Sequence, residues 1–447
     1  MIRPYSTLAL RFKTMSSQFI KYQPYVNGLV RLATSKVIED GNAWSQKVDI
    51  ALNGQAGDQL QALVPVQTRR EHGSFFTGHE LADRLLKHAD LTGIKTPVFF
   101  DPTVGASDLL IASARRLGMK KQIARTIESW GTQLTGIDQQ KEFIQASKAR
   151  LVLLARSMHE TFNEQKMDWT SVFPNIRAGD ALYENALYER ATHLVMNPPF
   201  AMMAAPKDCS WAKGKVNAAA VFMEHAVQHA RPGTQILAIL PEVLRTGTRY
   251  EKWQRVVTRM ADVERVESAG LFHNADVDVF ILVLRKRKVA MPVGNAFRDA
   301  NHRQTAQCLG DLFKVSVGPV VPHRDREEGA LYRYLHAKNA TPWNTLTRWP
   351  EKLNYKGTVF TPPFVVIRRT SRPGDKHRAT ASLVLGRTPV AVENHLIVCQ
   401  PNDGKVRSCE RLMECLKSST VDEFLNVEMR CRHLTVGSVR EIPIGRS

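Results

Sequence analysis

The residues with the clearest chemical potential lie in one short stretch, Thr192-His-Leu-Val-Met-Asn-Pro-Pro-Phe200. An apolar run that ends in a double proline predicts a buried strand followed by a rigid turn at Pro199. Asn197 offers a side-chain carbonyl oxygen, and Pro198 keeps its backbone carbonyl although it has no N–H. Two such acceptors can take both protons of an exocyclic NH2 group and leave its lone pair free as a nucleophile, while Phe200 offers a face for stacking a base. A rigid loop around a buried phenylalanine explains the tetrapeptide equally well.

Acidic side chains follow three other predicted strands, at Asp101, Asp138 and Asp180. In an open α/β sheet these strand ends meet at the edge where ligands bind. We expect Asp101 to bind an ammonium group, Asp138 two ribose hydroxyls and Asp180 an adenine amino group. Gly105 would let a ligand approach the backbone closely. Ile137 would pack on the face of the same adenine that Asp180 binds. Three such acids also occur in unrelated doubly wound proteins, so they do not identify a function alone.

A helix is predicted directly after Thr77. Thr77 suits the N-cap, Glu80 stands three residues later as in a capping box, and leucines form an apolar stripe behind it. The free N–H groups of such a helix start can receive a carboxylate. An ordinary capped helix without a ligand is the simpler interpretation.

The flanking segments carry weaker signals. Residues 1–68 predict a helical extension, and residues 201–217, which include Lys213 and Lys215, predict a mobile loop that closes over nucleic acid or is simply disordered. The basic run Arg285–Lys288 would end the catalytic domain and either contact phosphate or form a solvated strand end.

Composition indicates a globular protein with a polyanionic partner. The 447 residues are 43% hydrophobic, and no run approaches the ~20 apolar residues of a membrane span. The formal net charge is +19, which favours nucleic acid. From Arg285 to the end there are 28 Lys/Arg and 15 Asp/Glu, so this last third of the chain carries +13 of the net charge. Six cysteines without metal-like spacing indicate reduced thiols and a cytoplasmic protein.

The start of the chain leaves three alternatives open. The first 38 residues contain no acidic residue, as in a transit peptide. A true start at Met15 or a basic N-terminal arm fits equally well.

The order of these motifs resembles the N6-adenine DNA methyltransferases of the gamma arrangement, as in type I modification subunits and type II enzymes with a fused target recognition domain. The likeness covers residues 69–285 and rests on Phe76-Thr77, Asp101-Pro102 and the Asn197-Pro-Pro-Phe motif. It implies a Rossmann-like, seven-stranded α/β domain that uses S-adenosylmethionine, with no metal. Phe76, Thr77, Pro102 and Gly105 would join the three acids around the cofactor. Phe200 and Phe272 would stack on the flipped target base.

One position departs from the family pattern. Ser107 stands where such enzymes usually have a second glycine. Its Cβ could crowd the cofactor, which would weaken binding or remove activity.

The C-terminal third resembles a smaller α+β target recognition domain. Strands are predicted over residues 312–324, 363–372 and 390–399, and the likeness rests on the Gly318 turn and the Arg368-Arg-Thr-Ser segment. Base and phosphate contacts are expected from Arg324, Arg368, Arg369 and Arg372.

The sequence therefore predicts an extension over 1–68, a methyltransferase domain over 69–288 and a recognition domain over 289–447. The expected activity is methylation of adenine N6 in double-stranded DNA within a restriction-modification or phage-defence system, with a separate endonuclease or defence subunits as further partners. The alternatives are an RNA or protein-glutamine amino-methyltransferase and a DNA-binding subunit that has lost methyl transfer.

Overall fold

The computed structural model describes residues 19–35, 41–159, 171–272, 277–290, 307–322, 328–371, 375–428 and 434–444. The chain forms two compact units, which are treated separately below. The first comprises residues 1–241 and 252–297, and the second comprises residues 242–251 and 298–447. None of the helices in these described ranges has the length and apolar character that a membrane crossing requires.

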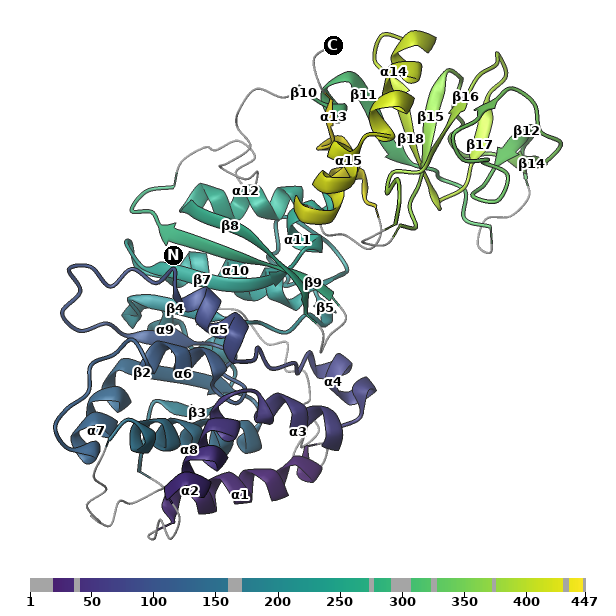
Figure 1. The fold of residues 1–447 in the computed structure, drawn as a ribbon. Coiled ribbons are helices and arrows are strands. Elements are labelled where there is room, and N and C mark those ends of the chain that lie inside the picture. Colours follow the sequence, from purple (N-terminus) through teal and green to yellow (C-terminus); the bar gives the residue numbers. More distant parts are fainter. Residues whose placement is uncertain are drawn as a thin grey trace. The chain divides into compact units, whose positions relative to one another are not determined.

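A seven-stranded sheet forms the centre of the first unit, in the order β3-β2-β1-β4-β7-β9-β8 (Figure 1). Neighbouring strands are parallel except at β9, which runs antiparallel to both β7 and β8. This is the predicted Rossmann-like arrangement. The strands are β1 Phe99–Asp101, β2 Leu134–Asp138, β3 Ile176–Ala178, β4 His193–Met196, β7 Gln235–Pro241, β8 Ala261–Phe272 and β9 Val277–Lys286.

Helices connect and cover these strands. The N-terminal helices are α1 Gln23–Thr34, α2 Gly41–Leu52, α3 Gln55–Leu63 and α4 Val66–His72. The helices between and after the strands are α5 His79–Leu86, α6 Asp108–Ala114, α7 Ile123–Gln133, α8 Lys141–Ser157, α9 Asn185–Arg190, α10 Ala218–His229 and α12 Glu251–Met260. Short 3-10 turns lie at Ile20–Tyr22, Ala181–Tyr183 and Thr248–Tyr250.

The predicted N-cap of α5 is wrong by one residue. The cap position is Gly78, whose φ of 76° suits glycine, and no side chain of the cap residue bonds the helix. The Asp108 carboxylate accepts the Gly78 N–H instead, at 2.8 Å. A carboxylate therefore does sit at this helix start, but it comes from α6, and the Thr77 hydroxyl is left for another partner.

Helices α1 and α2 pack on α8, outside the layer that covers β2 and β3 (Figure 1). Two buried arginines of α8 fasten them. Arg150 donates to the carbonyls of Ala51 and Leu52 at the end of α2, and Arg156 donates to three carbonyls at the end of α1. The extension is thus part of the core of this unit, because its helix ends depend on α8 for hydrogen bonds.

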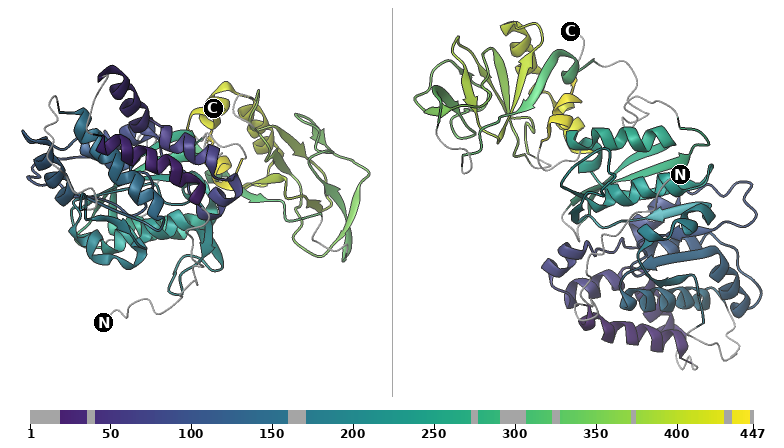
Figure 2. Two further views of the ribbon diagram at one scale, coloured as in Figure 1. Left: turned by 90° about the horizontal axis from the view of Figure 1, so that it is seen from below. Right: turned by 180° about the vertical axis from the view of Figure 1, so that it is seen from behind.

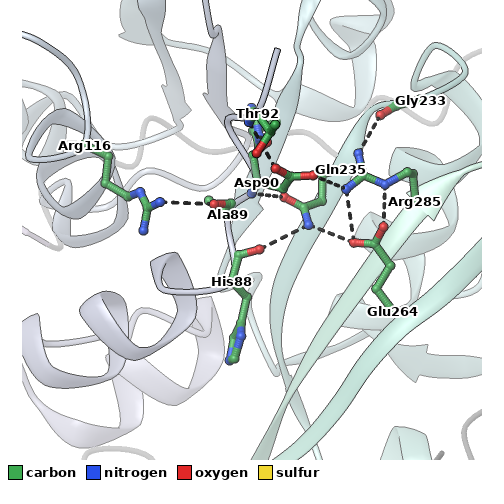
Figure 3. A network of polar contacts seen from close by, with 10 residues as sticks. His88, Ala89, Asp90, Thr92, Arg116, Gly233, Gln235, Glu264 and Arg285 are labelled. Carbon is green, nitrogen blue, oxygen red and sulfur yellow. Dashed lines mark hydrogen bonds and ion pairs between the residues drawn. The ribbon is translucent and has the colours of Figure 1, made fainter. Parts of the chain in front are cut away.

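Three residues of the basic run Arg285–Lys288, which begins at the end of β9, are bound to protein groups. Arg285 forms ion pairs with Glu264 and Asp90, in a network that also includes Gln235 (Figure 3). Lys286 donates to the Val227 carbonyl, and Arg287 pairs with Asp262 at 2.7 Å. These contacts lie at the amino end of β7 and favour a structural role over a phosphate contact.

The segment after Phe200 forms an antiparallel hairpin, where the sequence predicted a loop. Its strands are β5 Met202–Ala204 and β6 Lys215–Asn217. Trp211 is buried in it, and its indole N–H donates to Glu224 at 2.7 Å. The sequence did not predict the hairpin, because a composition rich in lysine and alanine does not show that one indole is buried and bound to α10.

The described residues of the second unit form two larger sheets and one two-stranded pair. The larger has the order β11-β18-β15-β16-β13, and the smaller has the order β14-β12-β17. Their strands are β11 Phe313–Val317, β12 Ala330–Leu335, β13 Thr345–Leu346, β14 Lys352–Tyr355, β15 Phe364–Arg368, β16 Ala381–Val384, β17 Val390–Val392 and β18 Leu396–Pro401, with a further pair β10 Gln307–Cys308 and β19 Pro443–Ile444.

Helices cover the larger sheet of this unit. They include α14 Val406–Leu416, which packs against β15, β16 and β18 and appears yellow in Figure 2. The other helices are α11 Val243–Thr246, α13 Leu309–Leu312, α15 Ser419–Glu423, a π-helical turn Phe424–Glu428 and α16 Val436–Arg440. Residues 242–251 group with this unit because Gly437 lies directly against the Thr246 carbonyl, where a Cβ would come within 2.0 Å.

The single strand predicted over residues 390–399 is two strands. β17 pairs with β12 and β18 pairs with β11 and β15, so the chain changes sheets near Glu393. Gly318 lies against that crossing, since a Cβ there would come within 2.1 Å of the Glu393 carbonyl. An apolar run on both sides of the crossing conceals it in the sequence.

Ser107 occupies a strained position before α6. Its φ is 73°, in the left-handed region that favours glycine, and its side chain is fully buried. Its hydroxyl has no hydrogen-bond partner among the described residues. The chain therefore keeps the backbone conformation of a glycine while holding a serine.

We predict that Ser107→Gly stabilises the protein by up to ~1 kcal/mol, because it removes left-handed strain and an unsatisfied buried hydroxyl. Urea denaturation followed by circular dichroism measures the change. The matched control is Ser113→Gly, in the last turn of α6, where the hydroxyl bonds the Leu109 carbonyl, and it should destabilise by ~1 kcal/mol because that bond is lost. A destabilised Ser107→Gly protein would show that the hydroxyl has a stabilising contact.

Candidate functional site

A cleft opens at the carboxyl ends of β3, β2, β1 and β4. It holds about 720 Å³ of empty space, counting its open mouth. Seven predicted residues line it: Phe76, Pro102, Gly105, Asp138, Asp180, Asn197 and Pro199. Residues that the four separate strand ends contribute therefore share one cavity.

A smaller cavity adjoins the same residues. Asp101, Thr77 and Asn197 line it together, with Phe76 and Gly105. Asn197 lines both cavities, so its side chain lies where the two meet. Ser107 lines neither of them, and its Cβ therefore does not narrow the cleft.

The two acids that line the cleft, Asp138 and Asp180, both accept backbone N–H groups. Asp138 accepts the backbone N–H of Gly105 at 3.0 Å through one oxygen and that of Gln140 at 2.9 Å through the other. It thereby joins the loop after β1 to the loop after β2. Asp180 accepts the N–H of Leu182 at 3.1 Å. Each carboxylate keeps lone pairs for a ligand.

Burial dominates the electrostatics of the cleft. It raises the pKa of Asp101 to about 8, against the bond from the Thr103 N–H, which lowers it, and the nearby Asp138 raises it further. Burial raises the pKa of Asp138 to about 6, against the backbone N–H groups of Gln140 and Gly105. Such a site favours a ligand that brings positive charge, because a cation would stabilise the ionised carboxylates.

The motif turn after β4 is fixed on several sides. The Asn197 side-chain nitrogen donates to the Thr77 hydroxyl at 3.1 Å, so its carbonyl oxygen is the acceptor left for a ligand. The Asn217 side chain donates to the Phe200 carbonyl at 3.0 Å. Gly73 lies against Pro199, since a Cβ at Gly73 would come within 2.4 Å of the proline Cβ.

Two aromatic rings stand beside this turn. Phe200 and Phe272 make an edge-to-face contact with ring centroids 6.1 Å apart. Phe272 ends β8, so the sheet brings it to the motif from far along the chain. The fold therefore brings together the two rings that the sequence assigned to the target base, and their contact with a base stays a prediction.

Some predicted residues lie elsewhere. Ile137 is fully buried and is not among the residues that line the cleft. Arg368 donates to the Ala340 carbonyl and Arg369 to the Asn394 carbonyl, so both guanidinium groups are held by the protein. Lys213 and Lys215 are exposed on the hairpin. Met15, Arg324 and Arg372 lie outside the described residues.

Sequence reasoning missed part of the cleft wall. His72, Phe75, Gln140, Phe143 and Phe222 also line it. The rings of Phe76 and Phe143 meet at 5.0 Å, and Phe143 also contacts Phe19 and Tyr22 from the N-terminal segment. Phe143 and Phe222 lie on α8 and α10, and no local motif marks them, because apolar positions on helices have the same pattern whether they face a core or a cavity.

Comparison with solved structures finds distant relatives. One is a protein from Listeria monocytogenes described as a class I S-adenosylmethionine-dependent methyltransferase, at 14% identity and a TM-score of 0.39, with 64% of this chain and 92% of that chain covered. A second is the M protein of the type I restriction enzyme EcoKI, at 17% identity and a TM-score of 0.37, with 63% of this chain and 66% of that chain covered. A third is DrdV in a complex with DNA, at 11% identity and a TM-score of 0.48, with 96% of this chain and 60% of that chain covered.

A comparison with curated proteins finds no match. The family model of the N-6 DNA methylases matches residues 57–308. This range is more than half of the chain and includes the cleft, the motif turn and the whole seven-stranded sheet. The chain therefore belongs to the N-6 DNA methylase family, which uses S-adenosylmethionine.

Proposed function

We propose that this protein methylates the N6 amino group of adenine in double-stranded DNA, as the modification component of a restriction-modification or phage-defence system that includes a separate endonuclease. One observation carries the proposal. Asn197 lines one cleft with Asp138 and Asp180 and the adjoining cavity with Asp101. An amide suited to holding an amino group thus borders a site suited to a positively charged nucleoside.

The residues of the cleft fit S-adenosylmethionine. Asp101 would hold its ammonium group, Asp138 its ribose hydroxyls and Asp180 the amino group of its adenine. Gly105 lets the Phe76 ring pack directly against the loop after β1, because its φ is 49° and a Cβ there would come within 2.9 Å of that ring. When bound, the cofactor supplies an electrophilic methyl group on a sulfonium.

The protein's part in the reaction is to hold the nucleophile. The Asn197 side-chain oxygen and the Pro198 carbonyl would accept the two amino protons of the target adenine, which keeps its lone pair directed outward. Phe200 and Phe272 would contact the base once it has left the duplex, where its amino group is otherwise paired. Most of the rate then comes from positioning and from electrostatic stabilisation.

The DNA contacts are also part of the proposal. Lys213 and Lys215 are exposed on the hairpin that follows Phe200, where they suit the backbone of the strand that carries the target. The second unit would serve as the recognition domain, which accords with the basic excess in the last third of the sequence.

Substrate class is tested by incubating the protein with methyl-labelled cofactor and unmethylated duplex DNA, ribosomal RNA or release factor. We expect label in DNA, recovered as N6-methyladenine after digestion to nucleosides. Label confined to RNA or protein would replace the proposed substrate. Cofactor binding without label in any of the three would favour a subunit that has lost methyl transfer.

We predict that Asn197→Ala lowers methylation of DNA by at least about 100-fold, because one of the two acceptors for the amino group is lost. DNA binding, measured by fluorescence anisotropy, should change by less than about threefold since the alanine removes no phosphate contact. The matched control is Asn402→Ala, at an exposed turn after β18. An active Asn197→Ala enzyme would remove Asn197 from the reaction.

We predict that cofactor affinity falls as the pH is lowered below 8. With a pKa of about 8, Asp101 is protonated in the empty site below that pH, and binding of the ammonium group requires its carboxylate. Between pH 7 and pH 6 the Kd measured by calorimetry should rise about tenfold or more. 5′-Methylthioadenosine, which lacks the ammonium group, serves as the control and should weaken only about twofold as Asp138 titrates. Equal pH dependence of the two ligands would contradict this role of Asp101.

A further inference from the structure

We propose that Thr77 is a positioning residue that orients the Asn197 side-chain amide for the reaction. This inference rests on the proposed function, since it assigns Asn197 the role of holding the target amino group. Its basis is the hydrogen bond of 3.1 Å in which the Asn197 nitrogen donates to the Thr77 hydroxyl oxygen.

The orientation of this amide matters because its two ends have opposite hydrogen-bonding character. The oxygen accepts protons and the nitrogen donates them. With the nitrogen bound to Thr77, the oxygen is the end of the amide that is left to accept from an amino group. A half-turn of the amide would place an NH2 group against the NH2 group of the target, where no hydrogen bond is possible.

A hydroxyl can also donate, so the direction of the bond depends on where its proton goes. Thr77 lines the same cavity as Asp101, at the site proposed for the amino-acid end of the cofactor. A cofactor carboxylate that takes the Thr77 proton leaves the hydroxyl only as an acceptor toward Asn197. Thr77 then serves the cofactor and the catalytic amide together, and an occupied cofactor site favours the productive amide orientation.

The backbone of Thr77 is held by a buried ion pair. Asp108 accepts the N–H of Gly78, the next residue, and pairs with Arg150 at 2.8 Å. Arg150 is fully buried and also donates to the carbonyl of Ala106 in the loop after β1. This ion pair therefore holds two segments in place. Asp108 accepts from the turn at Thr77 and Gly78, and Arg150 donates to the loop after β1.

The sequence suggested other roles for Thr77, as a helix cap or as a cofactor contact alone. Gly78 holds the cap position instead, and the Thr77 hydroxyl is directed to the motif turn. The role as a cofactor contact alone and the positioning role give different kinetics. A contact to the cofactor alone changes only the concentration needed for saturation, whereas a positioning role lowers kcat at saturation.

The test compares wild type, Thr77→Val and Thr77→Ser, with Asn197→Ala as the inactive reference. Calorimetry first gives the Kd of S-adenosylmethionine for each protein and shows that the site has formed. Methyl transfer to unmethylated duplex DNA is then measured at saturating cofactor. Thr77→Val keeps the shape of threonine but removes the hydroxyl, so kcat should fall about 10-fold to 100-fold. Thr77→Ser should recover kcat to within about threefold of wild type.

The control is Thr132→Val, an exposed position on α7, which should leave kcat and Kd unchanged. If Thr77→Val equals wild type in kcat once the cofactor saturates, the positioning role is wrong while the proposed function stands. If Thr77→Ser is as slow as Thr77→Val although both bind cofactor, the hydroxyl is not the acting group and the inference is also overturned. A wild-type protein that methylates no DNA would instead remove the proposed function and this role with it.

Discussion

The parallel pairing of β1 with β2 and β4 is the constraint on which the site depends. In register, Phe99 lies opposite Leu134 on one side and His193 on the other. The strands therefore end together, and the acids after β1 and β2 come to the same edge as the motif turn after β4. Residues about a hundred positions apart in the sequence become neighbours through backbone hydrogen bonds that involve none of their side chains.

A second layer of contacts turns this edge into a defined cavity. Asp138 joins the loops after β1 and β2, and the Arg150–Asp108 pair joins the loop after β1 to the threonine turn and to α2. Breaking a buried ion pair on one side usually costs several kcal/mol, since the remaining charge loses its partner. The N-terminal helices thus contribute to the site mainly by binding Arg150, and they supply few of the residues that line the cleft.

The sequence anticipated the parts of the site that follow from strand ends. An apolar run before an acid or before a double proline predicts both the strand and the edge at which it ends, and Asp138, Asp180 and Asn197 lie in one cleft as this pattern predicts. The partner of Thr77 was not predictable, because a threonine before a helix has the same local signal whether its hydroxyl caps that helix or turns away. Phe143 and Phe222 were missed for a similar reason, since the wall of a cavity and the wall of a core have the same periodicity.

The second unit shows where local patterns stop being informative. The run from Val390 to Cys399 has the composition of one strand, yet Val390–Val392 and Leu396–Pro401 belong to different sheets. The crossing is set by close backbone contact at Gly318, which no feature of the run itself records. Arg369 likewise resembles a base-reading residue in sequence, while in the fold its guanidinium group donates to a backbone carbonyl.

The central claim is that the carboxyl edge of this sheet presents a nucleoside cofactor to Asn197. A crystal structure of the protein with S-adenosylmethionine tests it most directly. The account predicts the adenosine across the ends of β2 and β3, the ammonium group at Asp101 and the sulfonium methyl facing the Asn197 side-chain oxygen. A cofactor bound elsewhere, or a methyl group directed away from residues 197 and 198, would contradict it.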